Sequence, residues 1–141
     1  MTNLRPFSDL ELLRAQFENL VEDLVEGTIP PCRQALSDAG LEPSDVDAVI
    51  HSAGIPRTAT GIPEDDYRLF NTEATVRFAN AAKRARVKRF LFLSSIRAQA
   101  GPTAAGVLTD GQEARPTDAY GRSKLEAEKG LAETGLEWAA L

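Results

Sequence analysis

Two residues in the stretch TDAYGRSKLEAE, residues 117–128, have the chemistry of a proton-transfer pair. Tyr120 and Lys124 are four positions apart, so a helix places both on one face. An ammonium beside a phenol favours the phenolate, and it lowers the pKa of the tyrosine from its usual value of about 10. A tyrosine tuned in this way can exchange a proton with a substrate hydroxyl. The spacing is equally compatible with an exposed tyrosine and lysine on an ordinary helix.

Ser94 and Ser95 strengthen the catalytic interpretation because of their position in the chain. They follow the apolar run FLFL, residues 90–93, which predicts a strand covered on both faces. In open α/β sheets, ligands bind beyond the carboxyl ends of the strands. A serine hydroxyl there can bind the substrate oxygen that Tyr120 protonates. The alternative is a pair of strand-end serines that hydrogen-bond only with backbone.

The elements that must position these groups follow an alternating order. Helices are predicted from a capping box at Ser8 and Glu11 to Leu24, and from Pro30 or Pro31 to Gly40. A turn precedes a strand within residues 46–54, and Pro63 stands near the start of a helix over 61–87. A strand over 88–95, a long loop over 96–116, a helix over 118–133 and a strand over 136–141 complete the order. Alternating helices and strands predict an α/β fold with a parallel sheet of about three strands.

Composition limits the classes of function. The chain has 141 residues and a net charge of −5, which suits a single domain with no general attraction to nucleic acid or anionic membranes. Cys32 and His51 are the only cysteine and histidine, so a His/Cys metal cluster is excluded and no metal site is expected. We expect Cys32 to be buried. Without an intrachain disulfide or a long apolar run, the chain is expected to be cytoplasmic.

Residues 46–141 resemble the middle of an extended short-chain dehydrogenase/reductase, the NAD-dependent nucleotide-sugar epimerase/dehydratase family. Four blocks carry the resemblance in the family's order: VDAVIHSAG, YRLFNTEATVRFANAAKRARV, KRFLFLSSI and DAYGRSKLEAE. Gly54 replaces an alanine, and Ala74 replaces a glycine, of the family's usual pattern. The resemblance implies a partial Rossmann-like three-layer fold, in which flanking helices and an N-terminal helix pair accompany the short sheet.

The resemblance also implies roles for individual residues. Ser95 would orient the substrate, Tyr120 would be the acid/base, and Lys124 would hold the nicotinamide ribose and lower the pKa of the tyrosine. The implied cofactor is NAD or NADP, and the implied substrate is a nucleotide-sugar-like small molecule. Asn71 would brace the active-site sheet. The residues expected at the cofactor are Ala53, Gly54, Asn71, Ser94 and Lys124.

The sequence departs from the family in two places. The family opens with a strand and a Gly-x-x-Gly-x-x-Gly turn that holds the pyrophosphate at a helix N-terminus, and no glycines here have that spacing. The chain also ends at Leu141, before the family's substrate-binding part. Acid/base groups without the hydride carrier cannot run this reaction, so we expect negligible turnover from the chain alone.

The N-terminal part resembles a different family. Residues 12–50 are similar to a helix pair and strand in the ATPase domain of a DnaK-type heat-shock chaperone. This resemblance implies a chimera or a truncated frame, with a helical segment at 1–45 and the epimerase-like segment at 46–141. The alternative function is then a non-catalytic α/β module. Its first strand would have a bare outer edge, through which such a module would self-associate.

Overall fold

The computed structural model describes residues 26–58, 61–104, 106–109 and 111–141. The chain divides into two compact units, Met1–Asp45 and Val46–Leu141, which are described separately. The predicted helix over 8–24, with its capping box, lies outside the described residues.

The described part of the first unit is a helix and a short turn. Residues 26–38 are helical, so the prediction that a helix begins at Pro30 or Pro31 is wrong. Both prolines lie within the helix. Because proline has no N–H, the carbonyl four residues before each proline loses its helical donor, but those carbonyls belong to exposed residues and can bond to water. The predicted stop at Gly40 is confirmed: its φ is 68°, and Gly40 N donates to Ser37 O at 3.0 Å. A 3-10 turn, η1, follows at Pro43–Asp45.

Cys32 is exposed, which contradicts the expectation that it is buried. That expectation rests on the general tendency of free cysteines to be buried. Cys32 lies in the helical residues 26–38, of which none is buried, so this stretch offers no core for the thiol to enter.

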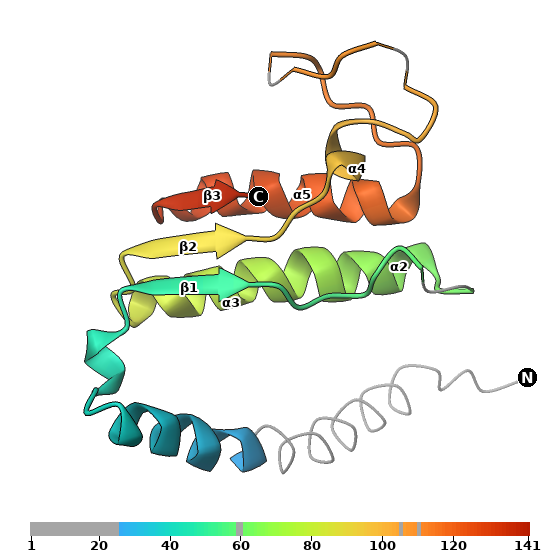
Figure 1. Ribbon diagram of the computed structural model, residues 1–141. Coiled ribbons are helices and arrows are strands. Elements are labelled where there is room, and N and C mark those ends of the chain that lie inside the picture. The colour runs from blue at the N-terminus through green and yellow to red at the C-terminus, as the bar shows by residue number, and fades with distance from the viewer. Residues whose placement is uncertain (1–25, 59–60, 105, 110) are drawn as a thin grey trace, which may run out of the picture. The chain divides into compact units, whose positions relative to one another are not determined.

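The second unit contains the sheet and most of the helices (Figure 1). A π-helical segment, η2, separates α2 from α3 without ending the helix. In chain order the elements are β1 (Ala48–His51), α2 (Glu64–Tyr67), η2 (Arg68–Glu73), α3 (Ala74–Arg84), β2 (Arg89–Phe92), α4 (Ile96–Gln99), α5 (Ala119–Thr134) and β3 (Trp138–Ala140).

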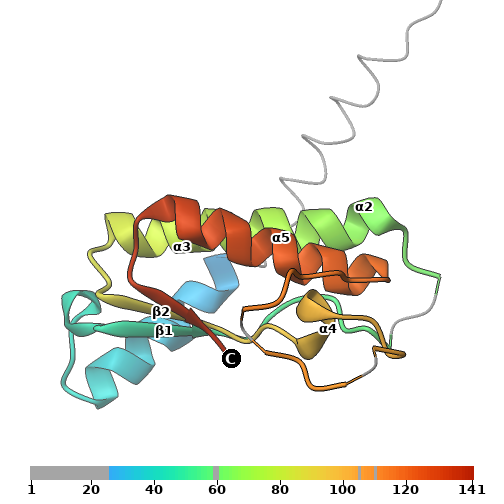
Figure 2. The same ribbon diagram turned by 90° about the horizontal axis from the view of Figure 1, so that it is seen from above.

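The three strands form one parallel sheet in the order β1-β2-β3. Val49 of β1 is the partner of Phe90 of β2, which is the partner of Trp138 of β3. Helices α3 and α5 lie side by side on the same face of this sheet (Figure 2). The predicted α/β class with a short parallel sheet is therefore confirmed, and β1 lies at one edge of the sheet.

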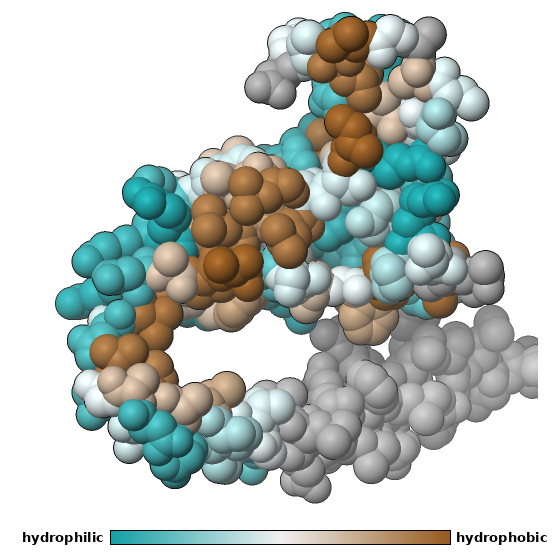
Figure 3. Space-filling view, in the orientation of Figure 1, coloured by the Kyte–Doolittle hydropathy of each residue, from teal (hydrophilic) through white to brown (hydrophobic). Residues whose placement is uncertain are grey.

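The core lies between the sheet and this helical layer. Phe90 and Phe92 of β2 are fully buried against Ala127 and Leu131 of α5. Leu91 and Leu93 alternate with these two residues and therefore point to the other face, where Leu93 is 39% exposed. Within the second unit, the helices α3 and α5 cover one face of this strand only, so coverage of both faces remains a prediction. The opposite face carries an apolar patch over the strands (Figure 3).

Helix α5 is fixed at both ends by its own sequence. Asp118 caps the N-terminus, since its carboxylate accepts the Gly121 N–H at 2.7 Å. Gly135 ends the helix in the left-handed conformation with a φ of 68°. The loop predicted over 96–116 begins with the short helix α4 instead, and a bridge between Ala100 and Arg115 closes its base.

Candidate functional site

Most of the predicted site residues gather at the carboxyl ends of β1 and β2. Ser94 and Ser95 follow β2, and residues 52–54 follow β1. Tyr120 and Lys124 approach from the N-terminal half of α5, whose first turn packs against α4. Gly121 is required at this contact, because a Cβ there would collide with the Arg97 carbonyl oxygen. The sequence places each group on its element, and the packing of α4 against α5 brings the groups together.

Lys124 is the most constrained group of the site. Its side chain is buried, with 5% of the residue exposed, and Nζ donates to the Leu93 carbonyl at 2.9 Å. Nζ lies 4.5 Å from the centre of the Phe92 ring and 5.8 Å from that of the Tyr120 ring. Burial lowers the pKa of Lys124, and the charge of Glu128 opposes this shift. The ammonium is thus directed at the end of β2.

Tyr120 presents its ring beside that of Tyr67. The two ring centres are 6.2 Å apart in an edge-to-face arrangement, which orients the half-buried Tyr120. Among the described residues, the hydroxyl of Tyr120 makes no hydrogen bond. A partner-free phenol on the lysine-bearing face of α5 is available to an incoming oxygen.

The two serines have different partners. Ser95 caps α4, and its Oγ accepts the Arg97 N–H at 3.2 Å. The hydroxyl of Ser94 instead donates to Oε1 of Glu128 on α5. The Ser95 oxygen therefore lies on the loop side of the strand end, whereas the Ser94 side chain joins β2 to α5.

Asn71 connects the loop after β1 to the helix that carries Tyr120. It is fully buried in the π-helical segment, accepts the Ile55 N–H at 2.7 Å and donates to the Ile55 carbonyl at 3.1 Å. The same amide nitrogen lies 3.1 Å from Ser123 Oγ, and Ser123 in turn donates to the Tyr120 carbonyl at 2.7 Å. Asn71 thus links three segments of the site through its side chain.

Gly54 is required by this network. Its φ is 151°, and a Cβ built on it would lie 2.6 Å from Asn71 Oδ1 and 4.0 Å from Lys124 Nζ. An alanine would therefore be both strained and in collision with Asn71. The neighbouring Ala53 is exposed, so the backbone after β1 is open to a ligand on one side while Asn71 supports it on the other.

His51 completes a polar chain behind the site. Thr75 Oγ1 donates to the Asn71 carbonyl at 2.7 Å, so it accepts from Nε2 of His51, which lies 3.0 Å away. This fixes the imidazole tautomer with the proton on Nε2. Burial, together with the nearby charge of Lys124, lowers the pKa of His51. The imidazole is therefore neutral at pH 7.

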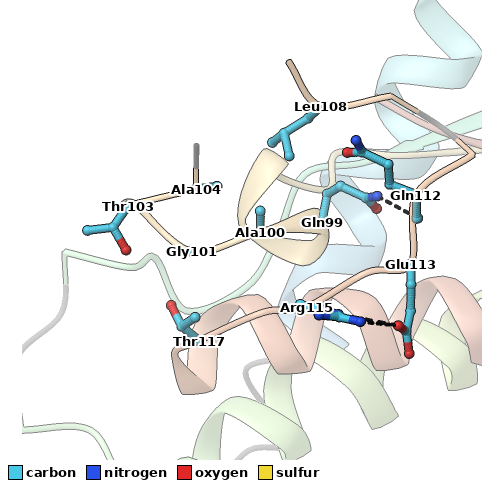
Figure 4. A pocket seen from close by; sticks show the side chains of 10 residues that line it. All are labelled: Gln99, Ala100, Gly101, Thr103, Ala104, Leu108, Gln112, Glu113, Arg115 and Thr117. Carbon is cyan, nitrogen blue, oxygen red and sulfur yellow. Dashed lines mark hydrogen bonds and ion pairs between the residues drawn. The ribbon is translucent and has the colours of Figure 1, made fainter. Parts of the chain in front are cut away.

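Two cavities lie near the loop that joins α4 to α5. The larger, about 560 Å³, is lined by loop residues whose polar side chains are largely paired: Arg115 with Glu113, and Gln99 with the Gln112 carbonyl (Figure 4). The smaller, about 280 Å³, includes Ser94, Ser95 and Glu128. We assign the candidate site to the strand end because the polar groups converge there, despite the larger volume in the loop.

Sequence reasoning missed three contributors: Glu128, Ser123 and Thr75. Glu128 had a detectable signal, since it lies four residues after Lys124 and therefore on the helix face that carries Tyr120 and Lys124. Ser123 and Thr75 had no such signal, because Ser123 contributes through its contact with the Asn71 side chain, and Thr75 through its bonds to the Asn71 carbonyl and to His51.

Fold and site together define a class: a parallel α/β unit that carries a tyrosine and a lysine on one helix beside a strand-end serine. The model of the NAD dependent epimerase/dehydratase family matches residues 16–138. The chain belongs to this family.

Solved structures agree with that assignment. A short-chain dehydrogenase/reductase superfamily protein from Agrobacterium tumefaciens with bound NAD is 31% identical, with a TM-score of 0.58 over 76% of this chain and 33% of that one. MoeE5 in complex with UDP-glucose and NAD is 28% identical, with a TM-score of 0.59 over 72% and 36%. UDP-glucuronic acid 4-epimerase from Bacillus cereus in complex with NAD, at 20% identity, shows the same fold with a TM-score of 0.59 over 72% and 35%. The chain spans about a third of the length of these relatives.

Two further expectations can be compared with these findings. It includes most of residues 12–50, the segment compared with a DnaK-type chaperone, and so gives no support to a chaperone segment or a chimera. Within the part of the chain that the structure describes, no helix has the length and apolar character needed to cross a membrane.

Proposed function

We propose that this chain provides the proton-transfer and nicotinamide-ribose half of an NAD-dependent epimerase/dehydratase site. The observation that carries the proposal is the approach of Lys124 to the end of β2, beside Gly54 and on the helix face of Tyr120. The family membership and the NAD bound in the Agrobacterium relative support it.

Each residue has a defined role in this proposal. Tyr120 exchanges a proton with a hydroxyl of the substrate at its phenolic oxygen. Ser95 donates a hydrogen bond to the same substrate oxygen and holds it in place, while Lys124 binds the ribose hydroxyls. Asn71 keeps the loop after β1 in position through its bonds to Ile55. The substrate class is a nucleotide sugar, as in MoeE5 with bound UDP-glucose.

The chain fits one half of the dinucleotide better than the other. Lys124, Tyr120 and the open backbone at Ala53 suit a ribose and a flat ring near the ends of β1 and β2. When bound, NAD supplies the nicotinamide that accepts the hydride. The sequence lacks the glycine spacing that holds a pyrophosphate, so the adenosine half has no matching cradle.

Calorimetric titration with half ligands tests the proposal. We expect NAD and nicotinamide mononucleotide to bind about equally, with a dissociation constant near or above 1 mM, or about −4 kcal/mol. We expect ADP not to bind, and Lys124→Met to abolish both of the other signals. Lys129→Met is the matched control, because it removes an exposed ammonium from the same helix. Binding of ADP but not of the mononucleotide would overturn the proposal.

A second candidate function rests on the sheet edge. Within the part of the chain that the structure describes, β1 has a paired strand on one side only, and Ile50 in β1 is 66% exposed. An exposed strand edge favours pairing with another copy of the chain. In this alternative the chain is a non-catalytic module that self-associates through β1.

Light scattering distinguishes the two functions. Self-association through β1 predicts a molar mass that rises with concentration and returns to that of the monomer in Ile50→Lys. Val107→Lys is the control, because Val107 is 81% exposed and lies in the loop between α4 and α5, outside β1. A monomer at all concentrations would contradict the second function and leave the first in place.

A further inference from the structure

Glu128 connects the end of β2 to the helix that carries Tyr120 and Lys124. It lies four residues after Lys124 and eight after Tyr120, so the three side chains follow one face of α5. Its carboxylate accepts the hydroxyl of Ser94, the residue immediately before Ser95. Ser94 is also held through its backbone, since its N–H donates to the Leu141 carbonyl at 2.9 Å.

The surroundings of Lys124 indicate that the Glu128 carboxylate also acts on the Lys124 ammonium. The ammonium is buried against the Phe92 ring and bonded to the neutral Leu93 carbonyl. The other titratable groups that face it are Tyr120 on α5 and His51 on β1, and the imidazole of His51, whose pKa is lowered, is neutral at pH 7. Within the described residues, Glu128 is the carboxylate whose charge acts on Lys124.

We propose that Glu128 is a positioning residue for the site: its carboxylate anchors Ser94 and, four residues after Lys124 on the same face of α5, supports the buried ammonium beside Tyr120. This inference rests on the proposed function, because it deepens the roles given there to Ser95, Tyr120 and Lys124. A buried cation with only dipolar partners is costly, and one carboxylate a helical turn away offsets that cost. The carboxylate also holds the side chain of Ser94, the residue before Ser95, and so fixes the end of β2 relative to α5.

The two tasks can be separated by substitution. Glu128→Gln retains an oxygen that accepts the Ser94 hydroxyl but removes the charge. Ser94→Ala removes the hydroxyl and retains the charge. Glu126→Gln is the matched control, because Glu126 is exposed on the same helix and its charge acts on Arg122.

The measurement is the titration of Lys124 by NMR in the ligand-free full chain with ¹³C-labelled lysine, assigned by the signal lost in Lys124→Met. We expect Glu128→Gln to shift the Lys124 midpoint to lower pH, and Glu126→Gln to leave it unchanged. Ser94→Ala should leave the midpoint near that of the wild type while it shifts the amide signal of Arg97, whose N–H bonds to Ser95. In Glu128→Gln the Arg97 amide should stay in place.

An unchanged Lys124 midpoint in Glu128→Gln, or an equal shift in Glu126→Gln, would overturn the electrostatic role. An Arg97 amide that does not respond to Ser94→Ala would overturn the anchoring role. These readouts need no cofactor, so they are independent of the nucleotide titration. Failure of nicotinamide mononucleotide to bind would count against the proposed function while the coupling of Glu128 to Lys124 stood.

Discussion

The side-chain amide of Asn71 pairs with the backbone of Ile55 through both of its polar atoms: Oδ1 accepts the N–H at 2.7 Å and Nδ2 donates to the carbonyl at 3.1 Å. The residues are 16 positions apart, and the pair holds the loop after β1 against the helix. The amide is fully buried, so it meets the backbone of the loop without competition from water.

Asn71→Ala should therefore lower the free energy of unfolding by about 2–3 kcal/mol, because it leaves the Ile55 groups without partners. Chemical denaturation measures this loss. Asn80→Ala is the control, since Asn80 lies on α3 and makes one local hydrogen bond, to the Val76 carbonyl. Equal losses in the two variants would show that Asn71 has no special structural role.

Gly54→Ala should destabilise the fold by about 1–3 kcal/mol, because the residue has a φ of 151° and the new methyl group collides with Asn71 Oδ1. Gly111→Ala should be close to neutral, since nothing lies within 4 Å of a Cβ at that position. Thermal unfolding of both variants provides the comparison. A stable Gly54→Ala protein would mean that the loop after β1 relaxes away from Asn71.

Stability should depend on pH through His51, the only histidine of the chain. Its pKa in the folded state lies below its ordinary value of 6.5, so the unfolded chain binds the proton more readily. The contribution of neutral His51 to the free energy of unfolding is complete above pH 6.5, and it is lost as the pH falls through the folded-state pKa. His51→Gln should remove this part of the pH dependence, while its amide can still donate to Thr75. Denaturation between pH 7 and pH 5 tests the sign, and an unaltered slope in the variant would assign it to carboxylates.

Lys83→Met should destabilise the protein by about 0.5–1 kcal/mol, because Lys83 Nζ donates to the Thr134 carbonyl at 2.7 Å and caps the C-terminus of α5. Arg84→Met is the control, since Arg84 lies at the same end of α3 and no hydrogen bond among the described residues involves its side chain. Denaturant midpoints should separate the two variants, and the difference should shrink at high salt. Equal midpoints would contradict the capping role.

The sequence predicts those parts of the fold whose signals are local. Helix α5 and its end at Gly135 could be predicted because a glycine directly after a helical pattern is a recognisable C-terminal signal. The π-helical segment around Asn71 could not, because residues 64–84 read as one continuous helix. Asn71 of this segment bonds to a loop 16 positions earlier in the chain, a contact that local patterns do not reveal.

The same distinction holds within the candidate site. Tyr120, Lys124 and Ser95 could be named from residue type and spacing, and their roles remain predictions. The partner of Ser94 could not be predicted, because it depends on how far α5 approaches the end of β2. The exposure of Leu93 also differs from expectation, since the apolar run around it does not reveal how many layers cover the strand.

The bridge between Ala100 and Arg115 gives the loop above the site a fixed base: the Arg115 N–H donates to the Gln99 carbonyl at 2.8 Å. Ser95 lies on one side of this closure and Tyr120 on the other. Between the two bridge residues, Leu108 and Thr109 line the same cavity as Ser94, Ser95 and Glu128. Mutation or grafting within this loop would therefore reshape one wall of that cavity, while the elements that carry Ser95 and Tyr120 lie outside the bridged segment.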